Sequence, residues 1–154
     1  MRIEISLCLP RDAATVSLVR GAVVNTLLLF GVDPDCADDI RLAVSEAVAN
    51  VVSHAVSEDE YEVSLAVDER TCAISVKNTG AGFDAGALNG VMPSPDSARG
   101  RGVAIMKAVM DAVNLTSSPE EGTLVRLVRD IRVSDDGPLA RLQRQSGPAG
   151  PQGR

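Results

Sequence analysis

The sequence has little basic charge. Its 154 residues contain 15 Lys and Arg against 21 Asp and Glu, which gives a formal net charge of −6 at pH 7. Binding to a nucleic-acid backbone requires clustered Lys and Arg side chains that displace counterions from the phosphates. The composition therefore argues against direct nucleic-acid binding. A basic protein partner or a metal-neutralised nucleotide fits this charge better.

Cysteines and long apolar runs are also scarce. The three cysteines, Cys8, Cys36 and Cys72, are scattered and lack the spacing of a metal site, so we expect reduced thiols and no disulfide framework. The stretch GAVVNTLLLF is interrupted by Asn25 and is too short to cross a bilayer. These features predict a cytoplasmic protein with no membrane segment.

Periodic apolar residues predict the first half of the secondary structure. Alternation in IEISLCL indicates a strand, and helical spacing indicates a helix over residues 12–30 that Gly31 ends. A second helix is expected to begin at Pro34, with Asp33 as its N-cap, and to run to about residue 57. Its apolar stripe consists of Ile40, Val44, Ala47, Val51 and Ala55.

The second half of the sequence predicts two hairpins and a third helix. A long loop over residues 79–99 separates the hairpins, and the third helix is expected to follow Gly102. The strands of the two hairpins are expected at residues 61–67 with 72–76 and at residues 112–117 with 123–129.

The order of these elements predicts the fold class. Strands and helices are mixed without a regular β-α-β alternation, which favours an α+β fold. We expect a two-layer α/β sandwich in which helices cover one face of a mixed, mostly antiparallel sheet. The length allows one domain with a core and is too short for two. This domain is expected over residues 1–133, followed by a disordered tail over residues 134–154.

One helix face carries a carboxylate and a carboxamide. In SEAVANVVSHA, Glu46 and Asn50 are four residues apart and project in similar directions, away from the apolar stripe. A solvated helix surface is the common explanation for an isolated pair of this kind. His54 continues the row, and a lone histidine there is more often a structural hydrogen-bonding residue than a ligand. The helix alone leaves both interpretations open.

Two glycine pairs follow this helix. In VKNTGAGFD, a predicted strand leads into Asn78, Gly80 and Gly82, which allow close approach to a flat ligand or form a simple turn. In ARGRGVAIM, Gly100 and Gly102 open a helix whose amide groups and dipole favour an anion. A dinucleotide-binding fold is disfavoured, because the second pair follows a loop and lacks a third glycine.

The order of these features resembles a known family. A helix bearing Glu-x-x-x-Asn is followed by a hairpin ending in Asn-x-Gly-x-Gly, a loop, a Gly-x-Gly that opens a helix, and a strand beginning GT. This order resembles the Bergerat ATP-binding fold of the GHKL superfamily, which is the histidine-kinase-like ATPase fold. It is most similar to the bacterial anti-sigma factor serine/threonine-protein kinases, and the resemblance covers residues 3–132.

The resemblance implies a site for ATP and Mg²⁺. Asn50 matches the asparagine that coordinates magnesium in the family, and Glu46 matches its general base, roles that suit an amide oxygen and a carboxylate. Arg99 or Arg101 is implied to meet the γ-phosphate. The nucleotide-binding positions implied by the resemblance are Asn50, Asn78, Gly80, Gly82, Arg99, Gly100, Arg101, Gly102 and Thr123.

The implied function is that of an anti-sigma factor and protein-serine kinase. Such a protein binds MgATP, sequesters a sigma factor and phosphorylates a STAS-domain anti-sigma-factor antagonist, commonly as a homodimer. Asn78 departs from the family, which usually has an aspartate there to accept the adenine amino hydrogen. The alternative is therefore a degenerate nucleotide-binding module that binds a sigma factor or antagonist without phosphotransfer. Asn78 favours this alternative, whereas Glu46 and Asn50 oppose it.

Overall fold

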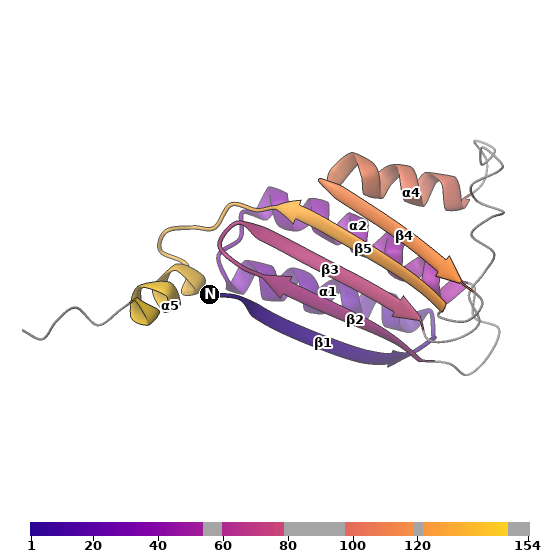
Figure 1. The fold of residues 1–154 in the computed structure, drawn as a ribbon, viewed down its shortest axis with the longest axis horizontal. Coiled ribbons are helices and arrows are strands. Elements are labelled where there is room, and N and C mark those ends of the chain that lie inside the picture. Colours follow the sequence, from indigo (N-terminus) through magenta and orange to yellow (C-terminus); the bar gives the residue numbers. More distant parts are fainter. Residues whose placement is uncertain (54–59, 79–97, 119–121, 148–154) are drawn as a thin grey trace, which may run out of the picture.

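The computed structural model describes residues 1–53, 60–78, 98–118 and 122–147. These ranges contain five strands and four helices (Figure 1). The strands are β1 (Ile3–Pro10), β2 (Glu60–Val67), β3 (Thr71–Asn78), β4 (Ala112–Ser118) and β5 (Gly122–Asp130). The helices are α1 (Ala14–Leu29), α2 (Pro34–Ser53), α4 (Ala98–Val109) and α5 (Pro138–Ser146).

The strands form a single sheet in the order β1-β2-β3-β5-β4. Every pairing between these strands is antiparallel, where we expected a mixed, mostly antiparallel sheet. In Figure 1, α1 and α2 lie behind the sheet, and α4 lies at the edge formed by β4. Helix α2 packs against both α1 and α4. The expected α+β sandwich with helices on one face is confirmed.

The core lies between the sheet and the helices. Strand residues alternate between a buried side that faces the helices and a more exposed side, as the period of two requires. The buried residues of β3 are Cys72, Ile74, Val76 and Asn78. The predicted stripe of α2 is buried at Ile40, Val44, Ala47 and Val51. Ala55, the last residue of that stripe, lies outside the described residues.

The turn between α1 and α2 follows the predicted signals. Gly31 follows α1 with φ 84°, a left-handed conformation that favours glycine. Asp33 caps α2, because its Oδ1 accepts a hydrogen bond from the Asp35 N–H at 2.8 Å. The Asp33 N–H donates to the Arg132 carbonyl at 2.8 Å. Helix α2 therefore begins near the end of β5 and runs toward the end of the sheet where β3 ends and β5 begins.

Two helix boundaries differ from the expectations. Helix α4 begins at Ala98, before Gly102, so that Gly100 and Gly102 both lie within its first two turns. The tail that we predicted to be disordered contains α5, whose Leu139 is fully buried. That prediction was wrong for α5, because Leu139 is buried and the segment before the helix is bonded to the α1–α2 turn, where the Ser134 N–H donates to the Gly31 carbonyl at 2.7 Å. Residues 148–154 lie outside the described residues.

All three cysteines are free thiols, and two of them belong to the core. Cys36 and Cys72 are buried and Cys8 is exposed. Burial raises the pKa of the Cys72 thiol to about 12, so this thiol stays protonated at neutral pH. As for membrane segments, no helix in the described ranges combines the length and the apolar composition that crossing a bilayer requires.

Candidate functional site

Glu46 and Asn50 lie one turn apart on the second half of α2. Both side chains are partly buried, although their neighbours Ala47 and Val51 belong to the core. The reason is that α4 packs alongside this part of α2. The pair therefore faces a second helix, which the solvated-surface interpretation did not anticipate.

Gly102 brings α4 directly against this pair. A Cβ atom at residue 102 would lie 2.9 Å from Oε2 of Glu46, and 3.7 and 3.8 Å from Oδ1 and Nδ2 of Asn50. Cβ atoms essentially never approach a non-bonded heavy atom of another residue within 3.0 Å. Any side chain at residue 102 would therefore displace the Glu46 carboxylate. The glycine thus leaves room for both functional groups beside the start of α4.

The N-terminal end of α4 lies beside Glu46 and Asn50. Gly100 is partly buried and Arg101 is exposed. Backbone amide groups and the helix dipole make such an end favourable for an anion. The glycine pair therefore lies inside the helix start instead of preceding it, and it brings that start close to Glu46 and Asn50.

Asn78 and Thr123 lie opposite each other near one end of the sheet. They are directly paired in the register of β3 and β5, and each is only 3% exposed. Opposite residues in an antiparallel pair share one face of the sheet. Asn78 shares its face with the core residues Ile74 and Val76, so both polar side chains lie on the helix-covered side.

The structure thus forms two groups of predicted site residues. Glu46, Asn50 and Gly102 meet between α2 and α4, and Asn78 pairs with Thr123 in the sheet. Asn78 and Thr123 lie where β3 ends and β5 begins, and in Figure 1 the start of α4 lies toward the same end of the sheet. The residues of the prediction that lie outside the described residues are His54, Gly80 and Gly82, together with the side chain of Arg99.

Tyr61 is a site neighbour that sequence reasoning missed. It pairs with Asn78 across β2 and β3 and is 1% exposed. Its Oη lies 2.6 Å from Oγ1 of Thr15, whose hydroxyl donates to the Asp12 carbonyl at 2.6 Å. Burial raises the pKa of Tyr61, which the Thr15 hydrogen bond partly offsets. The sequence offered one signal, a single tyrosine at the start of a predicted strand, but its partner depends on the register.

These residues fit a magnesium nucleotide. Asn50 offers the amide oxygen that Mg²⁺ accepts as a ligand. The start of α4 offers a place for phosphate oxygens, and Glu46 offers a carboxylate that can accept a proton. The space that a side chain at Gly102 would fill lies between these groups. The buried pair in the sheet adds polar groups that can recognise the edge of a base.

Comparisons with known proteins identify relatives of this chain. The family described as histidine kinase-like ATPase domain matches residues 9–129. The chain is 29% identical over 144 residues to the anti-sigma F factor of Pasteuria penetrans, covering 87% of this chain and 92% of that protein. It is 26% identical over 147 residues to the serine-protein kinase RsbW of Bacillus cereus, covering 87% and 91%.

Solved structures share the fold at lower identity. One contains the RsbU and RsbW domains of Rv1364c from Mycobacterium tuberculosis, with a TM-score of 0.64 and 19% identity over 86% of this chain and 34% of that one. Another is the SiaB-SiaC complex from Pseudomonas aeruginosa, with a TM-score of 0.52 and 17% identity over 82% and 88%. With a family match that spans most of its length, this chain belongs to the histidine kinase-like ATPase domain family.

Proposed function

We propose that the protein is an ATP-dependent protein serine/threonine kinase that acts as an anti-sigma factor. It binds MgATP, sequesters a sigma factor and phosphorylates a STAS-domain antagonist of that sequestration. The observation that carries the proposal is the close approach of Gly102 to Glu46 and Asn50. The similarity to proteins named serine-protein kinase RsbW and anti-sigma F factor supports the choice of partners.

Phosphate binding is assigned to α2 and the start of α4. Oδ1 of Asn50 ligates Mg²⁺, an ion that keeps several waters and needs few protein ligands. In this proposal the amide groups of the first turn of α4, up to that of Gly100, face the phosphates, as at other helix N-termini. Arg99 and Arg101 are the two candidates for contact with the γ-phosphate. MgATP, when bound, supplies the phosphoryl group that is transferred.

Glu46 is assigned as the general base. Its carboxylate would accept the proton of the substrate serine hydroxyl as that oxygen bonds to the γ-phosphorus of ATP and the bond from this phosphorus to ADP breaks, which releases ADP. A Cβ atom at residue 102 would lie 2.9 Å from Oε2 of Glu46. The carboxylate is therefore next to the start of α4, the proposed phosphate-binding element. In this proposal, the packing of α4 on α2 keeps the general base Glu46 next to the phosphate-binding site.

Base recognition is assigned to the sheet. Asn78 and Thr123 are buried, polar and directly opposite each other, which suits recognition of a flat base edge at the end of β3. Gly80 and Gly82 continue the chain from β3 and border the nucleotide in this proposal. An asparagine can both donate and accept hydrogen bonds, so Asn78 recognises adenine less selectively than an aspartate does.

The proposed partners are proteins. A net charge of −6 suits a basic protein surface and disfavours a nucleic-acid backbone. We assign the protein to the cytoplasm, as a homodimer that alternates between a sigma factor and a STAS-domain antagonist.

Transfer of labelled phosphate to STAS-domain proteins from the same genome tests the kinase. Glu46→Gln should lower the transfer rate by roughly 100-fold to 10,000-fold, the usual contribution of a general base, with little change in MgATP affinity. Glu62→Gln is the matched control, because Glu62 is exposed on β2, and it should transfer at the wild-type rate. Wild-type transfer by the Glu46→Gln variant would show that Glu46 is not the base.

A nucleotide-binding regulatory module without phosphotransfer is the second candidate function. The buried Asn78, in place of the usual aspartate, favours it. The same assay separates the two candidates. A wild-type protein that binds MgATP and a sigma factor, but labels none of the STAS-domain proteins, is a module and not a kinase.

A further inference from the structure

Arg129 joins three elements of the fold outside the candidate site. It lies on β5 opposite Cys72 of β3, on the helix-covered side of the sheet. Its Nη1 donates to the carbonyl of Val109 at 2.6 Å, and its Nη2 forms an ion pair with Oδ2 of Asp39 at 2.8 Å. Val109 is the last residue of α4, and Asp39 lies in the first half of α2. One guanidinium thus ties the sheet to both helices.

The positions of these contacts define how α4 lies on α2. Asp39 precedes Glu46 on α2 by seven residues, and Val109 follows Gly102 on α4 by seven residues. Seven residues of helix span about 10 Å. The two helices are therefore antiparallel and are held at two points, the Gly102 approach at one end and the Arg129 bridge at the other.

The chemistry of the bridge suits a fixed position. The side chains of Arg129 and Asp39 are 22% and 39% exposed, so solvent screens the ion pair only in part. The carbonyl of Val109 belongs to the C-terminal end of α4, where the helix dipole favours a cation. A planar guanidinium presents two donors in a fixed fork, whereas a lysine offers a single point charge. The fork therefore sets the position of α4 along α2.

We propose that Arg129 is a positioning residue that holds the start of α4 at the Glu46/Asn50 pair. Its polar contacts within the described ranges are with Val109 and Asp39, neither of which is assigned to nucleotide binding or catalysis. It acts by fixing the register of α4 on α2. The consequence for nucleotide affinity rests on the proposed function, whereas the consequence for the Gly102 environment does not.

The test uses the full chain in two measurements. Backbone amide and side-chain amide NMR signals of Gly102 and Asn50 report the α2–α4 register without nucleotide. Titration calorimetry then measures MgATP affinity at a temperature where every variant is folded. The variants are Arg129→Met, which removes both contacts, and Arg129→Lys, which can keep one. Arg126→Met is the matched control, since Arg126 is exposed on the same strand and faces the opposite side of the sheet.

Arg129→Met should shift or broaden the Gly102 and Asn50 signals. Suppose that Arg129→Met leaves α4 in its wild-type position along α2 only about one tenth of the time. The apparent Kd for MgATP then rises about tenfold. Arg129→Lys should fall between Arg129→Met and wild type, and Arg126→Met should match wild type. If Arg129→Met does not fold, an Arg129→Lys variant with changed Gly102 and Asn50 signals and a weaker MgATP affinity than wild type still supports the proposal.

Two results overturn the proposal. One is an unchanged Gly102 and Asn50 spectrum in both Arg129 variants. The other is MgATP affinity equal to that of wild type in variants whose spectra have changed. A wild-type protein that does not bind MgATP contradicts the proposed function instead, and the spectra without nucleotide still decide the role of Arg129.

Discussion

Gly102 is the residue at which helix packing and the proposed chemistry meet. Gly102→Ala places a Cβ 2.9 Å from Oε2 of Glu46, the mobile end of a flexible side chain that can move aside. Alanine also favours a helix over glycine by about 1 kcal/mol. We expect thermal stability to stay equal or rise, while phosphotransfer falls on the order of 10-fold to 100-fold because Glu46 is displaced.

Gly21→Ala is the control for this substitution. Gly21 lies in α1, and a Cβ there would meet nothing within 4 Å. It should raise stability by about 0.5–1 kcal/mol and leave transfer unchanged. Calorimetry and the labelled-phosphate assay measure the two quantities. Wild-type transfer by Gly102→Ala would mean that the observed position of the Glu46 carboxylate does not matter for the reaction.

We propose that Asn78 determines which nucleobase the site prefers. A carboxylate only accepts hydrogen bonds, so it suits the amino group of adenine and repels the carbonyl of guanine. Asn78→Asp should therefore tighten ATP binding by about 1 kcal/mol, which is several-fold in Kd, and weaken GTP binding. Titration of both nucleotides against both proteins measures this change.

Asn114→Asp provides the comparison for Asn78→Asp. Asn114 is exposed on β4, so the same chemical change there should alter neither affinity. An Asn78→Asp variant that loses ATP affinity, or that keeps the wild-type ratio of ATP to GTP affinity, would show that Asn78 does not read the base.

Among the elements, those with strong local signals could be predicted from the sequence. Helix α2 has an N-cap, a proline at its first position and a continuous apolar stripe, and its start was correct. Helix α4 opens with two glycines and two arginines, which give no apolar period and weaken helix propensity. Its start depends on packing against α2. Helix α5 is short, and its large apolar residues are Leu139, which is buried, and Leu142, which is 40% exposed. Two such residues make a periodic pattern too brief to stand out in the sequence.

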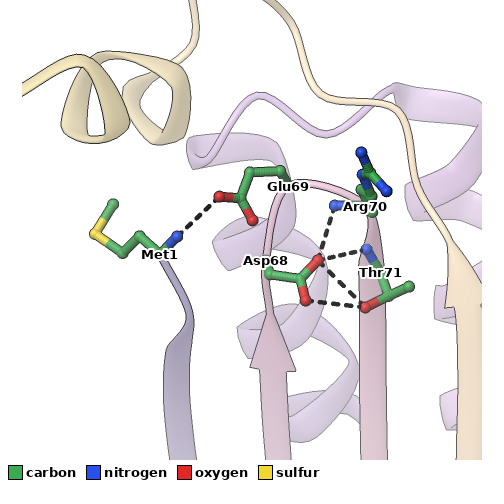
Figure 2. A network of polar contacts seen from close by, with 5 residues as sticks. All are labelled: Met1, Asp68, Glu69, Arg70 and Thr71. Atoms are coloured by element: carbon green, nitrogen blue, oxygen red, sulfur yellow. Dashed lines mark hydrogen bonds and ion pairs between the residues drawn. The ribbon is translucent and has the colours of Figure 1, made fainter. Parts of the chain in front are cut away.

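The turn between β2 and β3 makes a prediction about acid stability. Figure 2 shows that Oδ1 of Asp68 accepts hydrogen bonds from the N–H groups of Arg70 and Thr71, both at 2.8 Å. These bonds hold the pKa of Asp68 below its ordinary value. The ionised carboxylate therefore stabilises the fold above the unfolded-state pKa of about 3.9. This stabilisation is lost as pH falls through the depressed folded-state pKa.

Asp68→Asn isolates this contribution, because an amide keeps an acceptor oxygen but does not titrate. Wild type should be the more stable protein at pH 7, and its advantage should shrink below about pH 4. Urea unfolding of both proteins across this range measures the difference. If the difference in unfolding free energy between the two proteins is the same at pH 7 and at the lowest pH, ionisation of Asp68 does not contribute to the pH dependence of stability.

At the scale of the whole molecule, the candidate site and α5 lie at opposite ends. The N-terminus and α5 lie at one end of the sheet in Figure 1, and the start of α4 lies toward the other. The spacing of Glu46 and Asn50 was visible in the sequence. Their contact with Gly102 was not, because it joins residues more than fifty positions apart and depends on how α4 packs.

We propose that the Glu46/Asn50 face and the start of α4 form a magnesium nucleotide site. Titration calorimetry of MgATP against wild type, Asn50→Ala and Asn25→Ala tests it most directly. Asn25→Ala is the control, because Asn25 is exposed on α1. Wild type and the control should bind MgATP equally, and a concentration of about 100 times Kd should add about 2.7 kcal/mol of stability. Asn50→Ala should bind at least several-fold more weakly, because it removes the proposed oxygen ligand of the metal. The absence of MgATP binding by wild type, or equal affinity of Asn50→Ala and wild type, would show that these residues do not form such a site.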